Sequence, residues 1–201
     1  MNSREKILAA VAKNQPELIA LPEVPAFAVE ETDLVEKFTA VAVSIGSKVF
    51  RVQHMEEVKQ ILLQEHRNAG RIIALYPEFS DIAETAVDPD ADPHSLADVD
   101  LAVLPARLGV AENSALWVTD EDLPWRVLPF ICQHLALVLP QQHIVPLLQQ
   151  AYRVIAAQAY GFGTFIAGPS KTADIEQSLV LGAHGARTLT IFLIDNIMPQ
   201  R

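Results

Sequence analysis

Residues 188–194 read Thr-Leu-Thr-Ile-Phe-Leu-Ile, a nearly continuous apolar run that contains several β-branched side chains. A strand of this kind has apolar side chains on both faces, which is typical of a parallel sheet that helices cover on both sides. Further strand patterns alternate with helical patterns along the chain, as they do in α/β proteins. The sequence therefore predicts an α/β fold of three layers, in which a mostly parallel sheet is flanked by helices.

The other elements are predicted from the periodicity of the apolar residues. Apolar residues recur at helical spacing from Val35 to Ile45, so we expect a helix that ends before Gly46. Thr32 or Asp33 would cap its start. The other predicted helices are 55–64, 123–131, 143–158 and 172–181, and the other predicted strands are 48–52, 71–75, 100–104, 114–118, 134–139 and 164–167.

The first part of the chain has a different character. Ile7, Leu8 and Val11 lie on one face of a predicted helix, and a stretch with prolines at positions 16, 22 and 25 follows it. We therefore expect an N-terminal helix and a proline-rich arm at 1–32, and a single α/β domain at 33–201. A chain of 201 residues is long enough for one such domain with a full hydrophobic core.

Charge and hydropathy exclude several classes of protein. The net charge of -10 and the sequence pI of about 5.0 oppose binding to nucleic acid, and no cluster of basic residues offsets this charge. The mean hydropathy is +0.21, yet no apolar run approaches the roughly 18 residues of a membrane span. The start of the sequence lacks the pattern of an export signal, so we expect a soluble, cytoplasmic protein.

Cofactor chemistry is limited by the residues present. Cys132 is the one cysteine, whereas a protein-held iron–sulfur cluster generally needs about four thiolate ligands. The six histidines show no spacing typical of a metal site. We therefore expect that this chain binds no cluster, metal or other cofactor of its own.

The stretch 168–176 reads Gly-Pro-Ser-Lys-Thr-Ala-Asp-Ile-Glu and carries the densest set of reactive groups. It runs from a predicted strand into a predicted helix, where hydroxyl, ammonium and free N–H groups would meet the positive end of the helix dipole, and a carboxylate or phosphate could bind. In the alternative, a hydroxyl only caps the helix, the acids only stabilise its first turn, and the lysine is solvated. The residues concerned are Gly168, Ser170, Lys171, Thr172, Asp174 and Glu176.

A histidine follows shortly afterwards, in Leu181-Gly-Ala-His184-Gly185. Gly182 and Gly185 permit a positive φ, so this segment would turn the chain into the strand at 188–194. His184 would then lie at the rim of the sheet with Gly185. It is a candidate ligand contact there, and the alternative is a partner for the carbonyl groups at the end of a helix.

The turn Glu112-Asn113-Ser114, which leads into a predicted strand, is another candidate site. A carboxylate at the rim of a sheet can act as a nucleophile or a base. Glu112 is therefore a candidate catalytic residue, and Asn113 a candidate ligand contact. The alternative is an asparagine that only forms the turn and a glutamate that is only exposed to solvent.

The stretches 168–176 and 179–185 closely resemble motifs of the LUD-domain family, which includes lactate-utilization protein C. The resemblance extends to 109–112 and 143–145, and it covers the N-terminal half only through the order of the elements. It implies the fold of sugar-phosphate isomerases and coenzyme A transferases. The family commonly has Thr-Gly-Thr after the acidic residue, whereas Asn-Ser-Ala follows Glu112 here, which weakens the role assigned to that turn.

The resemblance also implies a function. It identifies the chain as a cluster-free subunit of a system that oxidises L-lactate to pyruvate, with partner proteins from the same operon, at least one of which holds iron–sulfur clusters. The chain would bind a small carboxylate or phosphate around Lys171, or dock onto the iron–sulfur partner, and would not be redox-active alone. Trp117, Trp125 and Phe130 are candidates for a docking surface, although aromatic side chains are more often part of the core.

An independent enzyme of the coenzyme A transferase or ligase type is the alternative. It would act on a small acid or a phosphorylated metabolite with Glu112 as nucleophile, and it rests on analogy of fold alone. The sequence leaves open the ligand, the electron acceptor, the formation of a homo-oligomer and the activity of the isolated chain.

Overall fold

The computed structural model describes residues 2–20, 22, 25, 27, 33–86, 88, 90–173 and 179–195. Contacts divide the chain into two units, Met1–Glu30 and Glu31–Arg201, and each is described by itself. The first unit contains helix α1 (Ser3–Lys13), which Asn2 caps by accepting a hydrogen bond from Glu5 N at 2.9 Å. The predicted apolar face of α1 is exposed within this unit, with 63% of Ile7 accessible to solvent.

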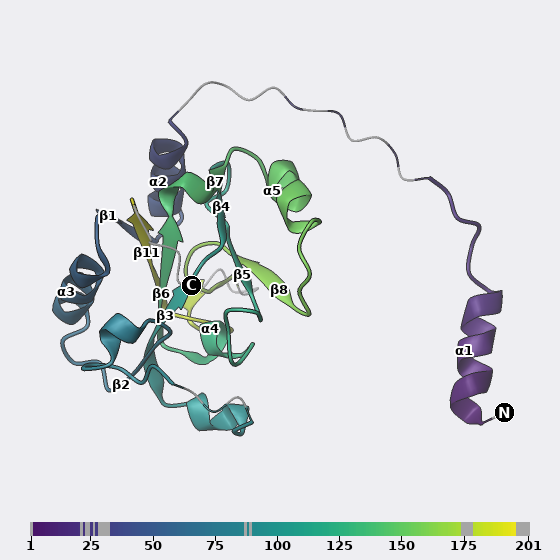
Figure 1. Cartoon of the computed structure of the whole chain (residues 1–201), viewed down its shortest axis with the longest axis horizontal. Helices are drawn as coiled ribbons and strands as arrows, with labels where there is room; N and C mark the ends of the chain where they lie inside the picture. The colour runs from purple at the N-terminus through teal and green to yellow at the C-terminus, as the bar shows by residue number, and fades with distance from the viewer. Residues whose placement is uncertain are drawn as a thin grey trace. The chain divides into compact units, whose positions relative to one another are not determined.

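A five-stranded parallel sheet forms the centre of the second unit. The apolar strand at 188–194 lies inside this sheet, with one neighbour on each side. The predicted fold class, a mostly parallel sheet flanked by helices, is confirmed (Figure 1). In spatial order the strands are β1 (Lys48–Val52), β11 (Thr188–Ile194), β6 (His134–Pro140), β3 (Val99–Pro105) and β2 (Arg71–Ala74).

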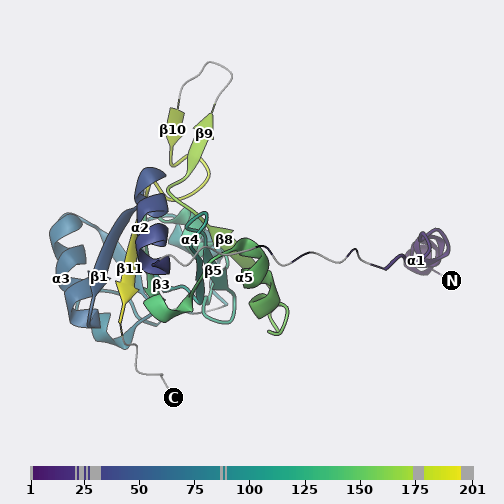
Figure 2. The ribbon, with the colours of Figure 1, turned by 90° about the horizontal axis from the view of Figure 1, so that it is seen from above.

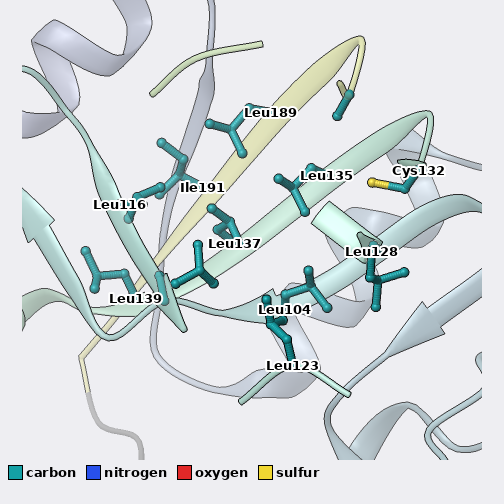
Figure 3. Close-up of a cluster of buried hydrophobic side chains, with 14 of the residues drawn as sticks. Leu104, Leu116, Leu123, Leu128, Cys132, Leu135, Leu137, Leu139, Leu189 and Ile191 are labelled. Carbon is teal, nitrogen blue, oxygen red and sulfur yellow. The ribbon is translucent and has the colours of Figure 1, made fainter. Parts of the chain in front are cut away.

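Successive residues of the central strands face opposite sides of the parallel sheet. On β6, Leu137 packs into one hydrophobic cluster and Val138 into another. Helix α3 (Met55–Glu65) covers the Val138 side, whereas α2 (Leu34–Ser44), α4 (Leu128–Ile131) and a second sheet cover the Leu137 side (Figures 1 and 3). Short 3-10 helices lie at Pro77–Phe79 (η1), Pro93–Leu96 (η2) and Gln141–His143 (η3).

The second sheet has four strands and mixed pairing. β4 pairs with β5 and β5 with β8 in antiparallel fashion, while β4 and β7 are parallel. Leu116 faces the parallel sheet, whereas Trp117 packs with helix α5 (Leu148–Ile155) on the other side. The sequence predicted strands at 114–118 and 164–167, but not that they form a separate sheet. In spatial order the strands are β7 (Ile144–Val145), β4 (Leu108–Val110), β5 (Leu116–Thr119) and β8 (Gly163–Ile166).

Two predicted helices are shorter than expected. The helix predicted at 143–158 begins only at Leu148, because the preceding residues 144–145 form β7. Pro146 explains the difference, since proline has no N–H and disfavours helical angles in the residue before it. The helix predicted at 123–131 is reduced to the single turn of α4.

The predicted helix that begins at Thr172 is wrong, because the described residues of that segment are strands. β9 (Lys171–Ala173) and β10 (Leu179–Leu181) form an antiparallel pair in which Thr172 lies opposite Val180. Both of these residues are β-branched, which favours a strand over a helix. Figure 2 shows the pair extending away from the two larger sheets.

The start of α2 is confirmed at Asp33, whose Oδ1 accepts hydrogen bonds from Val35 N at 2.9 Å and Glu36 N at 3.1 Å. Thr32, the other predicted cap, lies outside the described residues. After α2, Gly46 turns the chain toward β1 with a φ of +98°. Across the described ranges, no helix is both long enough and apolar enough to cross a membrane.

Two histidines pack against each other near the amino ends of the parallel strands, with their rings tilted by 47°. His66 follows α3 and His134 begins β6, and the centroids of their rings lie 4.7 Å apart. His134 Nδ1 also lies 2.8 Å from Thr188 Oγ1. Burial lowers the pKa of His66, and the neighbouring His134 lowers it further. Burial likewise lowers the pKa of His134, although Asp100 opposes this shift.

We expect the free energy of unfolding to fall as the pH drops below about 6.5, the pKa of a histidine in the unfolded chain. Below that pH the unfolded chain takes up protons that the folded His66 and His134 resist, whereas above it these side chains are neutral in both states. Urea unfolding at about pH 8 and about pH 5.5 measures the change in the free energy of unfolding. Both pH values lie above the range near pH 4 in which carboxylates of the unfolded chain titrate. The double variant His66→Gln/His134→Gln should lose less stability on acidification, and an equal loss in both proteins would contradict the prediction.

Candidate functional site

A cavity of about 530 Å³ lies beside the turn 167–171, which follows β8. Its volume falls within the range of roughly 300–1000 Å³ that is common for small-molecule sites. Leu135 and Leu189, near the amino ends of β6 and β11, contribute to an apolar wall, and Ile45 after α2 adds to it. The polar groups of the turn therefore lie opposite an apolar surface. Residues from distant parts of the sequence form that surface.

Ser170 is held in place by the segment that leads into β11. Its N–H donates to Ala186 O at 2.9 Å, and its carbonyl accepts from Gly182 N at 3.1 Å. The N–H of His184 also donates to Ser170 Oγ, at 3.4 Å. Gly168 precedes it with a φ of +72°, a conformation that favours glycine. The backbone at Ser170 is thus fixed by hydrogen bonds instead of by the helix start that the sequence predicted.

The ammonium group of Lys171 lies at this cavity, and no carboxylate among the described residues pairs with it. Its Nζ donates a hydrogen bond to the backbone carbonyl of Ile45. A Cβ atom on Gly46 would lie 3.4 Å from this Nζ, so the ammonium group fits closely against the end of α2. A carbonyl oxygen positions the ammonium group but does not neutralise its charge, which remains available to an anion.

The structure brings together five of the predicted ligand-binding residues, whereas Thr172 and Asn113 lie outside that group. Thr172 lies on β9 outside this lining, with its Oγ1 3.4 Å from Val180 O. Asp174 and Glu176 lie outside the described residues. Ligand binding by any of these residues stays a prediction. The five that line the cavity are Gly168, Ser170, Lys171, His184 and Gly185.

Glu112 and Asn113 do not line this cavity. Glu112 Oε1 accepts a hydrogen bond at 2.6 Å from the N–H of Leu148, the first residue of α5. Asn113 Oδ1 accepts one from Ala115 N at 3.0 Å, which shapes the turn between β4 and β5. Both side chains therefore have structural partners, and the catalytic role of Glu112 stays a prediction.

The sequence left open whether the aromatic candidates form a docking surface or part of the core, and the two tryptophans belong to the core. Trp117 and Trp125 are only 5% and 7% exposed and belong to the hydrophobic core. Phe130 is 38% exposed and lines the cavity described above. The apolar wall was not predicted, since Leu135 and Leu189 resemble ordinary core residues of buried strands.

Cys132 belongs to the hydrophobic cluster that contains Leu128 and Leu135 (Figure 3), and its thiol is free. It is 2% exposed, and burial raises the pKa of the thiol to about 12. Among the described side chains, no group of three or more histidine, cysteine or carboxylate residues could hold a metal ion. The expectation that the chain binds no cofactor stays a prediction.

Known proteins share the sequence pattern of this domain. The family model of the LUD domain matches residues 86–194, which is more than half of the chain and includes the turn at Ser170. Lactate utilization protein C from an Exiguobacterium species is 22% identical, and the alignment covers 83% of this chain and 80% of that protein. Lactate utilization protein C 1 from Bacillus mycoides is 27% identical over 54% of this chain. That alignment covers 49% of the Bacillus protein, so the chain spans about half the length of this relative.

Two further matches extend over most of the chain. An uncharacterized protein from Neisseria meningitidis serogroup B is 27% identical, with 99% of this chain and 97% of that protein aligned. A crystal structure of a DUF162 family protein from Deinococcus radiodurans has a TM-score of 0.64 and 16% identity, and covers 80% of this chain and 96% of that chain. This structural similarity supports the α/β fold, and the match to the family model shows the relationship in sequence. The chain belongs to the LUD-domain family.

Proposed function

We propose that this chain is a cluster-free subunit of an L-lactate oxidation system, and that it binds a small carboxylate such as lactate in the cavity beside Ser170 and Lys171. The observation that carries the proposal is the ammonium group of Lys171, which has no carboxylate partner among the described residues and lies at an apolar-walled cavity. The relatives named lactate utilization protein C support lactate as the metabolite.

The groups at the cavity suit a 2-hydroxy acid. Ser170 Oγ accepts from His184 N, so its own hydroxyl hydrogen is free to donate to a ligand oxygen. A carboxylate that accepts this bond and pairs with Lys171 gains a charge-assisted interaction. Leu135 and Leu189 offer an apolar surface for a methyl group.

The proposal assigns the redox step to partner proteins. Oxidation of lactate to pyruvate releases two electrons and two protons, and iron–sulfur clusters in the partners would accept the electrons. The thiol of Cys132 is buried and keeps its proton, so this chain offers no reactive thiol for the step. We therefore expect no oxidation of lactate by the isolated chain.

The transferase alternative gains no support from the geometry. Glu112 is exposed to solvent, lies outside the lining of the Lys171 cavity and caps α5 through Leu148 N. One oxygen of this carboxylate is thus engaged in holding the start of a helix. The absence of a Glu112 thioester after incubation with acyl-coenzyme A donors would exclude this route.

A genetic test addresses the proposed function directly. In a strain that lacks this gene and has no other lactate dehydrogenase, we expect lactate oxidation to be lost, and the intact chain to restore it. Lys171→Met keeps the aliphatic stem but removes the charge, so it should fail to restore oxidation. Lys37→Met, on the exposed surface of α2, is the matched control and should restore it. Oxygen consumption with L-lactate is the measurement, and immunoblots confirm equal protein levels.

Two outcomes would count against the proposal. If the deletion leaves lactate oxidation unchanged, the lactate assignment fails. If Lys171→Met restores oxidation as well as the intact chain does, the assignment to this cavity fails while the lactate role stands. Calorimetric titration of the purified proteins with L-lactate separates a loss of binding from a loss of assembly.

A further inference from the structure

A second and larger cavity, of about 630 Å³, opens near the amino ends of the parallel strands. Lys48 of β1, His134 of β6 and Thr188 of β11 line it, together with His66 and the residues that follow α3. It shares no lining residue with the cavity at Lys171. Nothing in the proposed lactate role uses this cavity, so the inference drawn from it stands independently.

Thr190 is a buried polar residue that lines this cavity. It is only 3% exposed, and its side chain forms no hydrogen bond with any described residue. On β11 it faces the same side of the sheet as Thr188, whose hydroxyl group lies 2.8 Å from His134 Nδ1. The hydroxyl oxygen of Thr190 is not among the fully buried polar atoms that lack a partner, so it is open to the cavity, where a ligand can reach it.

Charged groups from several neighbouring segments surround the histidine pair. Lys48 and Glu65 form an ion pair, so their charges offset each other. Asp100 accepts a hydrogen bond from Gly70 N at 2.6 Å, which occupies one of its oxygens. Arg67 lines the cavity and makes no ion pair with any described residue. Arg187, at the turn before β11, adds a positive charge beside His134.

The contact between the two histidine rings links this cavity to the uptake of protons. With ring centroids 4.7 Å apart, two protonated imidazole rings would repel each other. An anion with two negative charges between Arg67 and this pair offsets that repulsion, and it can accept hydrogen bonds from both rings. A carboxylate carries a single charge, whereas a phosphate group has the charge and the number of acceptor oxygens that these donors match.

We propose that this cavity binds a phosphate group, either as free phosphate or as part of a small phosphorylated molecule, and that His66 and His134 take up protons when it binds. Arg67, His66 and His134 supply the charge, and Thr190 donates a hydrogen bond.

Sulfate is the first probe, because it keeps its double charge across the pH range in which phosphate changes charge near pH 6. Calorimetric titration of the full chain, at ionic strength matched with chloride, should show binding at least about tenfold tighter near pH 5.5 than near pH 8. Titration in buffers of different ionisation enthalpy should also reveal proton uptake at the lower pH. Sulfate affinity that is independent of pH, or an absence of saturable binding at both pH values, would overturn the proposal.

Variants identify the residues and the cavity. His66→Gln/His134→Gln should lose the pH dependence and the proton uptake, and Thr190→Val should weaken binding with little change in shape. His184→Gln and Lys171→Met, at the other cavity, should keep the pH dependence of sulfate binding and the proton uptake. If these two controls abolish binding and the histidine variant does not, the sulfate binds at the Lys171 cavity and the proposal fails.

Two further titrations near pH 6.5, where a phosphate group keeps much of its second charge, distinguish the sources of the phosphate group. Glycerol 3-phosphate that binds more tightly than inorganic phosphate would show that the cavity recognises a phosphorylated molecule. Equal affinities would assign it to free phosphate. Failure of both to bind where sulfate binds would refute a phosphate site.

Discussion

Leu137→Ala is expected to lower the free energy of unfolding by about 3 kcal/mol, within the range of about 2–5 kcal/mol for leucine truncation in a rigid core. Leu137 lies on β6 at 0% exposure, in the cluster between the two sheets (Figure 3). Leu116 of the second sheet belongs to the same cluster. Truncation therefore removes contacts that hold the two sheets together. Neither sheet can fill the resulting cavity without moving relative to the other.

Urea unfolding followed by circular dichroism measures this loss, and Leu63→Ala is the matched control. Leu63 lies on α3 at 44% exposure, so its truncation should cost less than about 1 kcal/mol. We expect a single unfolding transition in both variants, because one core serves both sheets. A loss below about 1 kcal/mol for Leu137→Ala would show that the two sheets are not held by this cluster.

Gly163→Ala is expected to destabilise the protein by about 1–3 kcal/mol or more, although it adds only one methyl group. A Cβ atom at this position would lie 2.2 Å from Cζ2 and 2.4 Å from Cη2 of Trp117, far inside van der Waals contact. The indole ring is only 5% exposed and packs against Phe165, with ring centroids 4.7 Å apart, so it has little room to move away. Strand β8 must shift instead.

A shift of β8 would also move the candidate site, because β8 leads directly into the turn that contains Gly168 and Ser170. We therefore expect Gly163→Ala to weaken the binding of carboxylates as well as the fold. Gly161→Ala is the control, since this residue is exposed and its added Cβ would lie 2.8 Å from Asp120 and 3.1 Å from Arg126, farther than from Trp117 at position 163. Urea unfolding and titration with L-lactate measure both effects, and equal stability of the two variants would refute the role assigned to the indole contact.

The strands could be predicted from sequence better than their arrangement. The bounds of β1 and β11 match the predicted ranges 48–52 and 188–194, because turn residues flank each of them. Their pairing could not be predicted, since β1 hydrogen-bonds to β11 and not to β2. The separation of β4, β5, β7 and β8 into a second sheet was also missed, because an apolar strand looks the same in either sheet.

Some residues that line the candidate site were predicted from the sequence, but the predicted reason for their grouping, a helix start, was wrong. Gly168, Ser170 and Lys171 were found through their chemistry, yet the helix start that was to organise them does not exist among the described residues. A short apolar run such as 179–181 suits a strand as well as a helix, so periodicity could not decide. The contact between Lys171 and Ile45 had no signal in the sequence, because it joins residues that are far apart in the chain.

The position of β11 has a consequence for how the protein is made. β11 pairs with β6 on one side and with β1 on the other, so it is the strand that attaches β1 to the sheet. During synthesis on the ribosome β1 emerges first, and its hydrogen-bonding partner follows only after most of the chain has been translated. Until then the strand edges of the nascent chain are open to wrong partners, which is the state that chaperones protect. Ribosome stalling ahead of residue 188 would thus leave an open sheet with β1 unattached.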